Sequence, residues 1–216
     1  MSSTGLKWPR DLAFDSAGNL YVSNGGNNTI KKFTPDGVGS VFASTGLYNP
    51  MGLAFDNAGN LYAANYRPAG WEVGILKFTP GGVGSLFVRT GLVYPVGLAF
   101  DSAGNLYAAN QYSSHIEKYS PTGADLGVFA KSGLSSPFGL AFDKAGNVYV
   151  VNQTSYPPGY ITMITADGIS SLFVNTASRL PMFIAIKQVR DPTPMISCSP
   201  PLILECTNGE AVAARF

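Results

Sequence analysis

The sequence predicts an all-β protein, a β-propeller of four-stranded antiparallel blades, and three observations support this prediction. The segment 12–24 returns three times, as 53–65, 98–110 and 140–152. The prolines that precede the successive copies lie 41 to 45 residues apart: Pro9, Pro50, Pro95, Pro137 and Pro181. Each unit has four short strand patterns and no helical period, which is typical of propeller blades. A solenoid is the weaker alternative, because solenoid turns are commonly shorter.

The second unit shows how each element is predicted. In 52–56, Leu53 and Phe55 point to one side and alternate with Ala54, as in a strand. The second strand, 60–65, is apolar on both sides, which indicates a sheet packed between two neighbours. The third and fourth strands are expected at 74–78 and 86–88. Their counterparts in the other copies are 29–33, 115–119 and 160–164 for the third strand, and 41–43, 128–130 and 172–174 for the fourth.

An Asp-x-Ala-Gly-Asn turn joins the first two strands of every copy. The Asp carboxylate can accept backbone N–H bonds, and the glycine supplies the positive φ of a tight hairpin. Each turn offers a single carboxylate, whereas a calcium loop offers several oxygens within one short segment. We therefore expect the four aspartates to cap turns: Asp15, Asp56, Asp101 and Asp143.

Composition excludes two classes of partner. Charged residues make up 12% of the chain, with 14 Lys and Arg against 13 Asp and Glu, and they form no basic stripe. We therefore expect no nucleic-acid binding. No apolar run approaches the roughly 18 residues of a membrane span. The first residues lack the basic and apolar stretches of a signal peptide.

The repeat resembles the NHL-type blade. The matching motifs are Pro50-Met51-Gly52-Leu53-Ala54, Asn60-Leu61-Tyr62 and the segment 30–37 (Ile-Lys-Lys-Phe-Thr-Pro-Asp-Gly). The resemblance covers about residues 8–189, and we assign 1–189 to the propeller. Related propellers are the gluconolactonase and senescence-marker-protein group and the virginiamycin B lyases. Such families usually close with six blades, so four copies and one further first strand at 183–186 imply a truncated six-bladed array. Open blade edges would then favour a homodimer.

The sequence changes character after the repeats. Residues 190–194 are predicted to be a linker, and 195–216 resemble the opening of an HYR-type immunoglobulin-like module. That resemblance implies a secreted or cell-surface bacterial protein. Cys198 and Cys206 are the chain's two cysteines. They could form a disulfide across a hairpin or pair with cysteines outside this sequence.

Four asparagines end the second strands: Asn24, Asn65, Asn110 and Asn152. In a propeller, this end of the strand shares a face with the connectors between blades. A ring of amides there could hold Ca²⁺ or another divalent ion, and these four are the candidate metal ligands. The alternative, which we favour, is that each amide hydrogen-bonds backbone groups at the loop entry.

The copies differ most in the loop after each asparagine. Aromatic, amide and arginine side chains on one face suit the recognition of a carbohydrate or a protein. The alternative is that the tyrosines only cover the ends of the sheets. The candidate ligand-binding residues are Tyr48, Tyr66, Arg67, Trp71, Tyr94, Tyr112 and Tyr156.

The sequence therefore favours a non-catalytic binding or scaffold module without a cofactor. The alternative is a metal-dependent hydrolase or lyase, lactonase-like or virginiamycin-lyase-like. Lactonase relatives carry a metal-binding Asp after the proline that opens a blade, but the matching positions hold no acid: Arg10, Met51, Val96, Phe138 and Met182. Asp11 stands alone one place later. His115, the single histidine, has no partner identifiable in the sequence and is expected to be structural.

Overall fold

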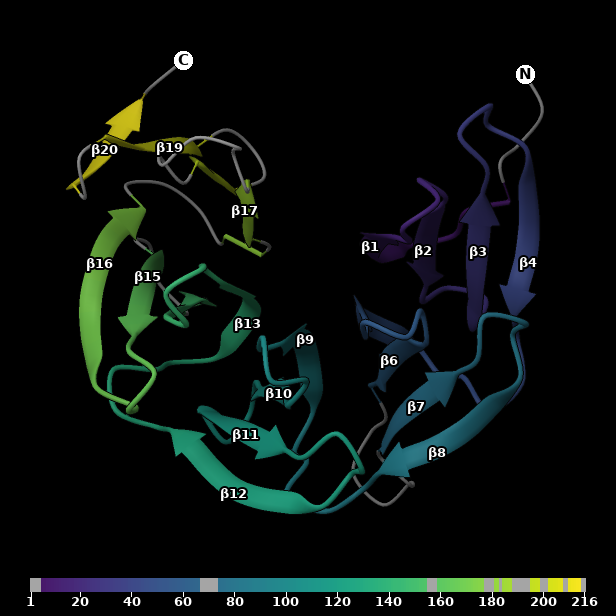
Figure 1. Cartoon of the computed structure of the whole chain (residues 1–216), viewed down its shortest axis with the longest axis horizontal. Coiled ribbons are helices and arrows are strands. Elements are labelled where there is room, and N and C mark those ends of the chain that lie inside the picture. Colours follow the sequence, from purple (N-terminus) through teal and green to yellow (C-terminus); the bar gives the residue numbers. More distant parts are fainter. Residues whose placement is uncertain are drawn as a thin grey trace.

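The computed structural model describes residues 5–66, 74–154, 159–176, 181–182, 184–187, 195–198, 202–207 and 210–214. The regular elements of these residues are strands, which form antiparallel four-stranded sheets set side by side in an arc (Figure 1). Four of the sheets are the blades predicted from the repeats. In each blade, chain order equals strand order, and the first strand lies at the inner side of the arc.

The strands match the predicted segments closely. Blade 1 comprises β1 (Pro9–Phe14), β2 (Leu20–Asn24), β3 (Thr29–Phe33) and β4 (Gly39–Ala43); blade 2 comprises β5 (Pro50–Phe55), β6 (Leu61–Asn65), β7 (Gly74–Phe78) and β8 (Gly84–Val88). Blade 3 comprises β9 (Pro95–Phe100), β10 (Leu106–Asn110), β11 (His115–Tyr119) and β12 (Asp125–Ala130); blade 4 comprises β13 (Pro137–Phe142), β14 (Val148–Asn152), β15 (Gly159–Ile164) and β16 (Ser170–Thr176). The outer strands begin two or three residues earlier than expected, because the pairing continues from the third turn.

The strand that follows the four repeats belongs to a further sheet. β17 (Ile184–Lys187) pairs with β18 (Met195–Cys198), and β19 (Leu202–Thr207) and β20 (Glu210–Ala214) complete a further four-stranded sheet. The predicted linker 190–194 lies outside the described residues, and the immunoglobulin-like character of 195–216 stays a prediction. The register pairs Cys198 with Leu202 and Cys206 with Ala211.

The predicted turn-capping role of the aspartates is confirmed. In blade 2, Asp56 Oδ1 accepts hydrogen bonds from Ala58 N at 3.0 Å and Asn60 N at 2.8 Å, and Oδ2 accepts one from Asn60 Nδ2 at 2.8 Å. Gly59 provides the positive φ, +79°. Burial by itself would raise the pKa of Asp56, but these bonds and the Tyr62 hydroxyl lower it below its ordinary value.

One aromatic contact recurs at the boundaries between blades. A tyrosine of the second strand meets, edge to face, a phenylalanine of its own outer strand and one from the first strand of the next blade. The ring centroids are 5.0 Å apart for Tyr21 and Phe55. They are 4.9 Å apart for Tyr62 and Phe100, and 4.8 Å apart for Tyr107 and Phe142. Each such pair adds about 0.5–1.5 kcal/mol to the burial itself. The core therefore lies between blades, which explains second strands that are apolar on both faces.

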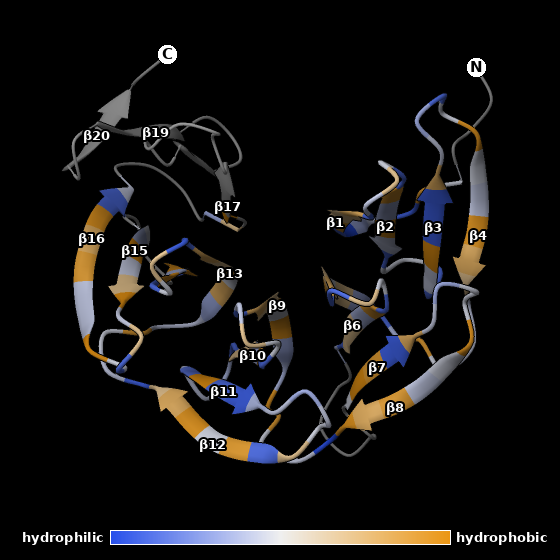
Figure 2. Cartoon of the chain, viewed as in Figure 1, coloured by the Kyte–Doolittle hydropathy of each residue, from blue (hydrophilic) through white to orange (hydrophobic). Residues whose placement is uncertain are grey.

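In the part of the chain that the structure describes, the arc is open and one face of blade 1 is uncovered. Figure 1 shows blade 1 and the sheet β17–β20 at opposite ends of the arc. Leu12 and Phe14 of β1 are 59% and 61% exposed, whereas Leu53 at the matching position of blade 2 is 5% exposed. Figure 2 shows further apolar residues along the outer strands β4, β8, β12 and β16, the solvent side of every blade. In the described part of the chain, the structure has no helix with the length and apolar character of a membrane span.

Candidate functional site

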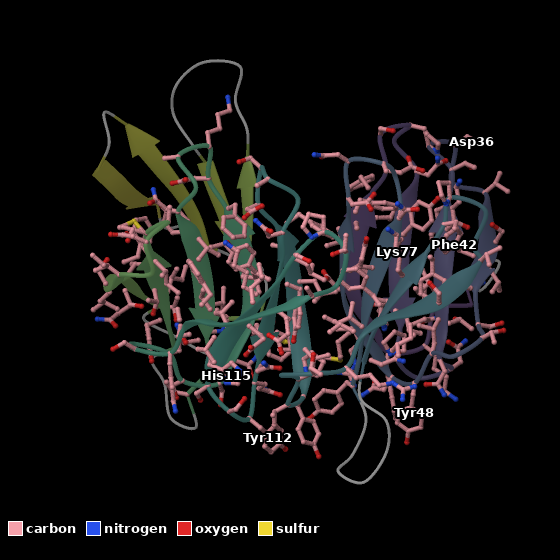
Figure 3. All side chains as sticks on the ribbon, turned by 60° about the horizontal axis from the view of Figure 1, so that its bottom comes forward. Asp36, Phe42, Tyr48, Lys77, Tyr112 and His115 are labelled. Atoms are coloured by element: carbon pink, nitrogen blue, oxygen red, sulfur yellow. The ribbon has the colours of Figure 1, made fainter. Side chains whose placement is uncertain are left out.

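The candidate site lies at one end of the blades, where the loops after the second strands meet the connectors between blades. We call this surface the loop face. Tyr48 from a connector and Tyr112 from a loop project from the same end of the molecule, and Asp36 from a third turn lies at the other end (Figure 3). The predicted common placement of these variable segments is therefore confirmed for Tyr48 and Tyr112.

The buried asparagines bind the connectors. Their Oδ1 atoms accept hydrogen bonds from the backbone N–H of Lys7, Tyr48, Val93 and Ser135 at 2.6–3.1 Å. In the first three blades, Nδ2 donates to the carbonyl oxygen of Gly5, Gly46 or Gly91. In blade 4, Asn152 Nδ2 reaches Val150 O and Thr162 Oγ1, and Thr162 Oγ1 donates to Gly133 O. Each amide thus already has backbone partners, as in the interpretation that we favoured.

The connectors hold a strained residue before each blade's first proline. Trp8, Asn49, Tyr94 and Ser136 have φ between +39° and +53°. A left-handed conformation costs a residue with a side chain of the order of 1 kcal/mol or more, so it persists only where the surroundings fix it. At Tyr94 the carbonyl oxygen accepts a hydrogen bond of 3.1 Å from Gln111 N. This contact fixes the connector against the loop that follows β10.

Three of the predicted tyrosines form one cluster. The rings of Tyr94 and Tyr112 are stacked, with centroids 4.1 Å apart and planes at 30°, and the Tyr66 ring lies 5.0 Å from Tyr94. Burial raises the pKa of Tyr66 to about 12, and the hydrogen bond with the Tyr112 side chain adds to the rise. Tyr112 is 67% exposed, so the cluster offers a flat aromatic surface to solvent.

The remaining predicted residues are Tyr48, Arg67, Trp71 and Tyr156. Tyr48 is 39% exposed and projects from the same end of the molecule as Tyr112. Arg67, Trp71 and Tyr156 lie outside the described residues.

Arg10, which was not among the predicted binding residues, lies near the connector that holds Asn49. It occupies the ring of first-strand positions that is apolar elsewhere, at Met51, Val96, Phe138 and Met182. Its side chain lies over Gly25 beside Asn49, and its charge opposes the raised pKa of Tyr66. Among the described residues, its buried Nε has no hydrogen-bond partner. In the sequence, Arg10 could have been singled out because it is the one charged residue at a position that is apolar in the other copies.

His115 has a partner that the sequence did not reveal. Its Nε2 lies 2.8 Å from Glu117 Oε2 and 2.8 Å from Asn110 Nδ2. Burial and the nearby Asp125 raise the pKa of Glu117, while His115 opposes the rise. The Glu117 side chain packs over Gly91, where an added Cβ would lie 2.8 Å from its carboxyl carbon. The pair therefore joins blade 3 to the preceding connector, consistent with a structural histidine.

Asp11 bridges the first two blades. Its carboxylate accepts hydrogen bonds of 2.8 Å from Leu12 N and from Leu53 N of the next blade. Burial raises the pKa of Asp11 to about 6, although both bonds oppose this. Within the described residues, no three His, Cys, Asp or Glu side chains gather in a way that could hold a metal ion. A cleft between the outer strands β4 and β8 is lined by apolar and small polar residues, and its lining includes none of the three clustered tyrosines.

The fold and the loop face define a β-propeller with an exposed aromatic cluster at one end. The family model of the NHL repeat matches residues 6–33, which span the first connector and β1 to β3. The other three blades repeat the turn and strand motifs of this matched segment. A comparison with the sequences of curated proteins found no match.

Solved structures share this fold at low sequence identity. The chain resembles a protein in a nidogen/laminin complex (TM-score 0.75, 19% identity, covering 92% of this chain and 75% of that one). It resembles a putative gluconolactonase (TM-score 0.73, 17% identity, 96% and 76%). It also resembles the virginiamycin B lyase of Staphylococcus aureus (TM-score 0.69, 15% identity, 96% and 69%). At these identities the likeness establishes the propeller fold alone.

Proposed function

We propose that this chain is a non-catalytic binding module of a secreted or cell-surface protein, and that it recognises a protein or carbohydrate through the loop face. The observation that carries the proposal is the cluster of Tyr66, Tyr94 and Tyr112, whose outermost ring is 67% exposed. Stacked tyrosines provide contact area at low conformational cost, and their hydroxyls supply hydrogen bonds. The surface is built on anchored connectors, which suits binding without rearrangement.

The structural relatives support more than one choice of ligand. One of them comes from a complex of two proteins, nidogen and laminin, which supports protein binding. Others are described as a gluconolactonase and a lyase, which keeps a metal-dependent hydrolase or lyase as the alternative. That alternative requires an ion, so metal analysis of the purified protein and thermal shifts with Ca²⁺, Zn²⁺ and Mg²⁺ would test it. A stoichiometric ion that is needed for turnover would replace the binding proposal.

The binding proposal is tested on an array of neutral and acidic oligosaccharides. We expect retention by the wild-type protein, and roughly tenfold weaker retention by Tyr112→Ala, since the exposed half of the stack is lost. Asp36→Ala, at the opposite end of the molecule, is the matched control and should bind as the wild type does. Unchanged retention after Tyr112→Ala would contradict the assignment of the site.

We also propose that a second copy of the chain covers the open face of blade 1. Phe14 occupies the position at which Phe55 and Phe100 receive a tyrosine edge from the preceding blade, yet it is 61% exposed. Sedimentation velocity should show a mass that grows with concentration, and Leu12→Lys should shift it to the monomer. Leu172→Lys, at an exposed outer-strand position, should not. A wild-type protein that stays monomeric at 100-fold higher loading would refute this pairing.

A further inference from the structure

A cleft of about 560 Å³ lies between the outer strands of blades 1 and 2. Leu76 and Leu86 of blade 2 line it together with Phe42 of blade 1 and the connector residues 44–46. This volume falls within the range of clefts that hold small molecules, about 300–1,000 Å³. None of the three clustered tyrosines of the loop face is among its lining residues, so the cleft is a site separate from the proposed binding surface.

Leu76 is the residue at which this part of blade 2 differs from the other blades. In every blade, the residue after the buried isoleucine of the third strand packs against a connector glycine of positive φ. In blade 2, an added Cβ on Gly46 would lie 3.4 Å from Leu76 Cδ1. The corresponding pairs are Gly5 and Lys31, Gly91 and Glu117, and Gly133 and Thr162. The other three blades therefore place an amine, a carboxyl group or a hydroxyl group where blade 2 has a leucine.

This leucine gives the cleft apolar side chains from both blades. Leu76 lies opposite Leu86 in the register of β7 and β8, and Leu86 is 47% exposed. From blade 1, the half-buried Phe42 meets the Phe78 ring at a centroid distance of 6.2 Å. Covering the exposed part of these side chains would be favourable, because it removes apolar surface from water. The lining also contains hydroxyl groups that can donate or accept hydrogen bonds, those of Ser44, Thr45 and Ser85.

The absence of charge in the lining selects the kind of molecule that fits. None of the described residues that line the cleft ionises. Lys77 follows Leu76 and lies on the other face of β7, where its Nζ is 3.6 Å from Asp56 Oδ2. Lys32 of blade 1 has its Nζ 5.3 Å from the centroid of the Tyr21 ring. A charged ligand would therefore lose hydration in the cleft without gaining an opposite charge among the lining residues.

These observations define one class of ligand. We infer that the cleft between β4 and β8 binds a small uncharged molecule that is largely apolar and carries a hydroxyl group. Its apolar part lies against Leu76, Leu86 and Phe42, and its hydroxyl group bonds to a hydroxyl group of the lining. This site goes beyond the proposed function of the loop face and does not depend on it.

The test uses the uncharged fluorophore N-phenyl-1-naphthylamine, whose emission rises in apolar surroundings. Titration of the wild-type protein should show a single saturable site. 1-Naphthol should displace the fluorophore at a concentration at least about tenfold lower than 1-naphthoate, which has the same rings and a carboxylate in place of the hydroxyl group.

Variants of Leu76 locate the site. Leu76→Lys, which copies the residue of blade 1, should weaken binding of the fluorophore by about tenfold or more. Leu76→Met keeps an apolar side chain of similar volume and should bind within about twofold of the wild type. Thermal unfolding checks that each variant is folded, and Leu76→Thr, which copies blade 4, replaces Leu76→Lys if that variant does not fold. The matched control is Leu172→Lys: Leu172 is 62% exposed, lies opposite Thr162 and should not affect binding.

Each other outcome overturns a part of the inference. Equal losses in Leu172→Lys and Leu76→Lys would mean that the fluorophore adheres to exposed apolar side chains of the outer strands, and the cleft would not be a site. Displacement by 1-naphthoate as readily as by 1-naphthol would refute the preference for an uncharged ligand. Binding that weakens as the protein concentration rises would mean that a second copy covers the cleft. No saturable binding by the wild type would refute the site itself. Tyr112→Ala should leave all these results unchanged, so they are independent of the loop face.

Discussion

Replacement of Gly97 by alanine should separate two neighbouring blades. Gly97 lies on the inner strand β9, and an added Cβ would come closer than 3.0 Å to the carbonyl oxygen of Phe138 on β13, and within 3.1 Å of a Leu140 methyl group. Ordinary contacts of a Cβ begin near 3.4 Å, so the two strands must move apart by at least 0.4 Å. The opposing atom belongs to the backbone of a packed strand and cannot rotate away.

The expected cost follows from this geometry. Overpacking that flexible side chains can absorb costs about 1–3 kcal/mol. Because backbone must move here, we expect Gly97→Ala to lower the free energy of unfolding by about 3 kcal/mol, the top of that range. For a chain of this length, that is a fall in Tm of roughly 6–12 °C.

The assay is urea unfolding followed by tyrosine fluorescence, with Gly81→Ala as the matched control. An added Cβ on Gly81 meets only Thr79 Oγ1, at 3.9 Å, and Gly81 is not in the positive-φ region. This control should be neutral or stabilised by up to about 1 kcal/mol, through the lower entropy of the unfolded chain. If the free energies of unfolding of the two variants lie within about 1 kcal/mol, the close approach of the inner strands is refuted.

Three further predictions concern the polar contacts. The raised pKa of Asp11, about 6 against an ordinary 3.8, means that the folded state holds this proton more tightly than the unfolded state. Stability should therefore fall by up to about 3 kcal/mol as pH rises from about 4 to about 6. The difference between wild type and Asp11→Asn in urea titrations at both pH values measures this, and a pH-independent difference would contradict it. The pKa of Asp101 is lowered by hydrogen bonds that outweigh the effect of burial, so its contribution is lost as pH falls below the ordinary range, and Asp101→Asn should flatten that part of the acid limb. Asn110→Ala leaves Val93 N and Gly91 O without their partner and should cost about 2–3 kcal/mol, against little change for the exposed Asn57→Ala; equal unfolding midpoints would show that the amide does not fix the connector.

The blade itself was predictable because its determinants are close together in the sequence. The hydrogen bonds of Asp56 run to Ala58, Asn60 and Tyr62, all close in sequence, so the turn motif can be interpreted from the local sequence. The alternation of Leu53 and Phe55 likewise reports the two sides of a single strand. The loop face also followed from the repeat, since every second strand ends at the same end of its blade.

The site depends on contacts between residues that are far apart in the sequence. Tyr66, Tyr94 and Tyr112 were all predicted as binding residues, but their mutual stacking depends on how blade 2, a connector with positive φ and blade 3 pack together. The contact between His115 and Glu117 was missed, although the two are close in sequence. Glu117 is buried because the connector that contains Gly91 covers it, and the sequence does not show that packing. Asp11 was set aside as an isolated acid, since its partner Leu53 N lies in the next blade.

The sequence by itself determined the blade: four strands, their turns and the end of the sheet at which variable side chains collect. These features arise from hydrogen bonds and side-chain alternation within about a dozen residues. The tertiary structure alone decided which residues meet between blades. It stacked Tyr112 on Tyr94 and brought Tyr66 to the same cluster, and it left the Phe14 ring exposed where its counterparts receive a tyrosine edge. Such contacts depend on how one blade packs against another. A repeated local pattern does not predict that packing at a position where one copy differs from the others.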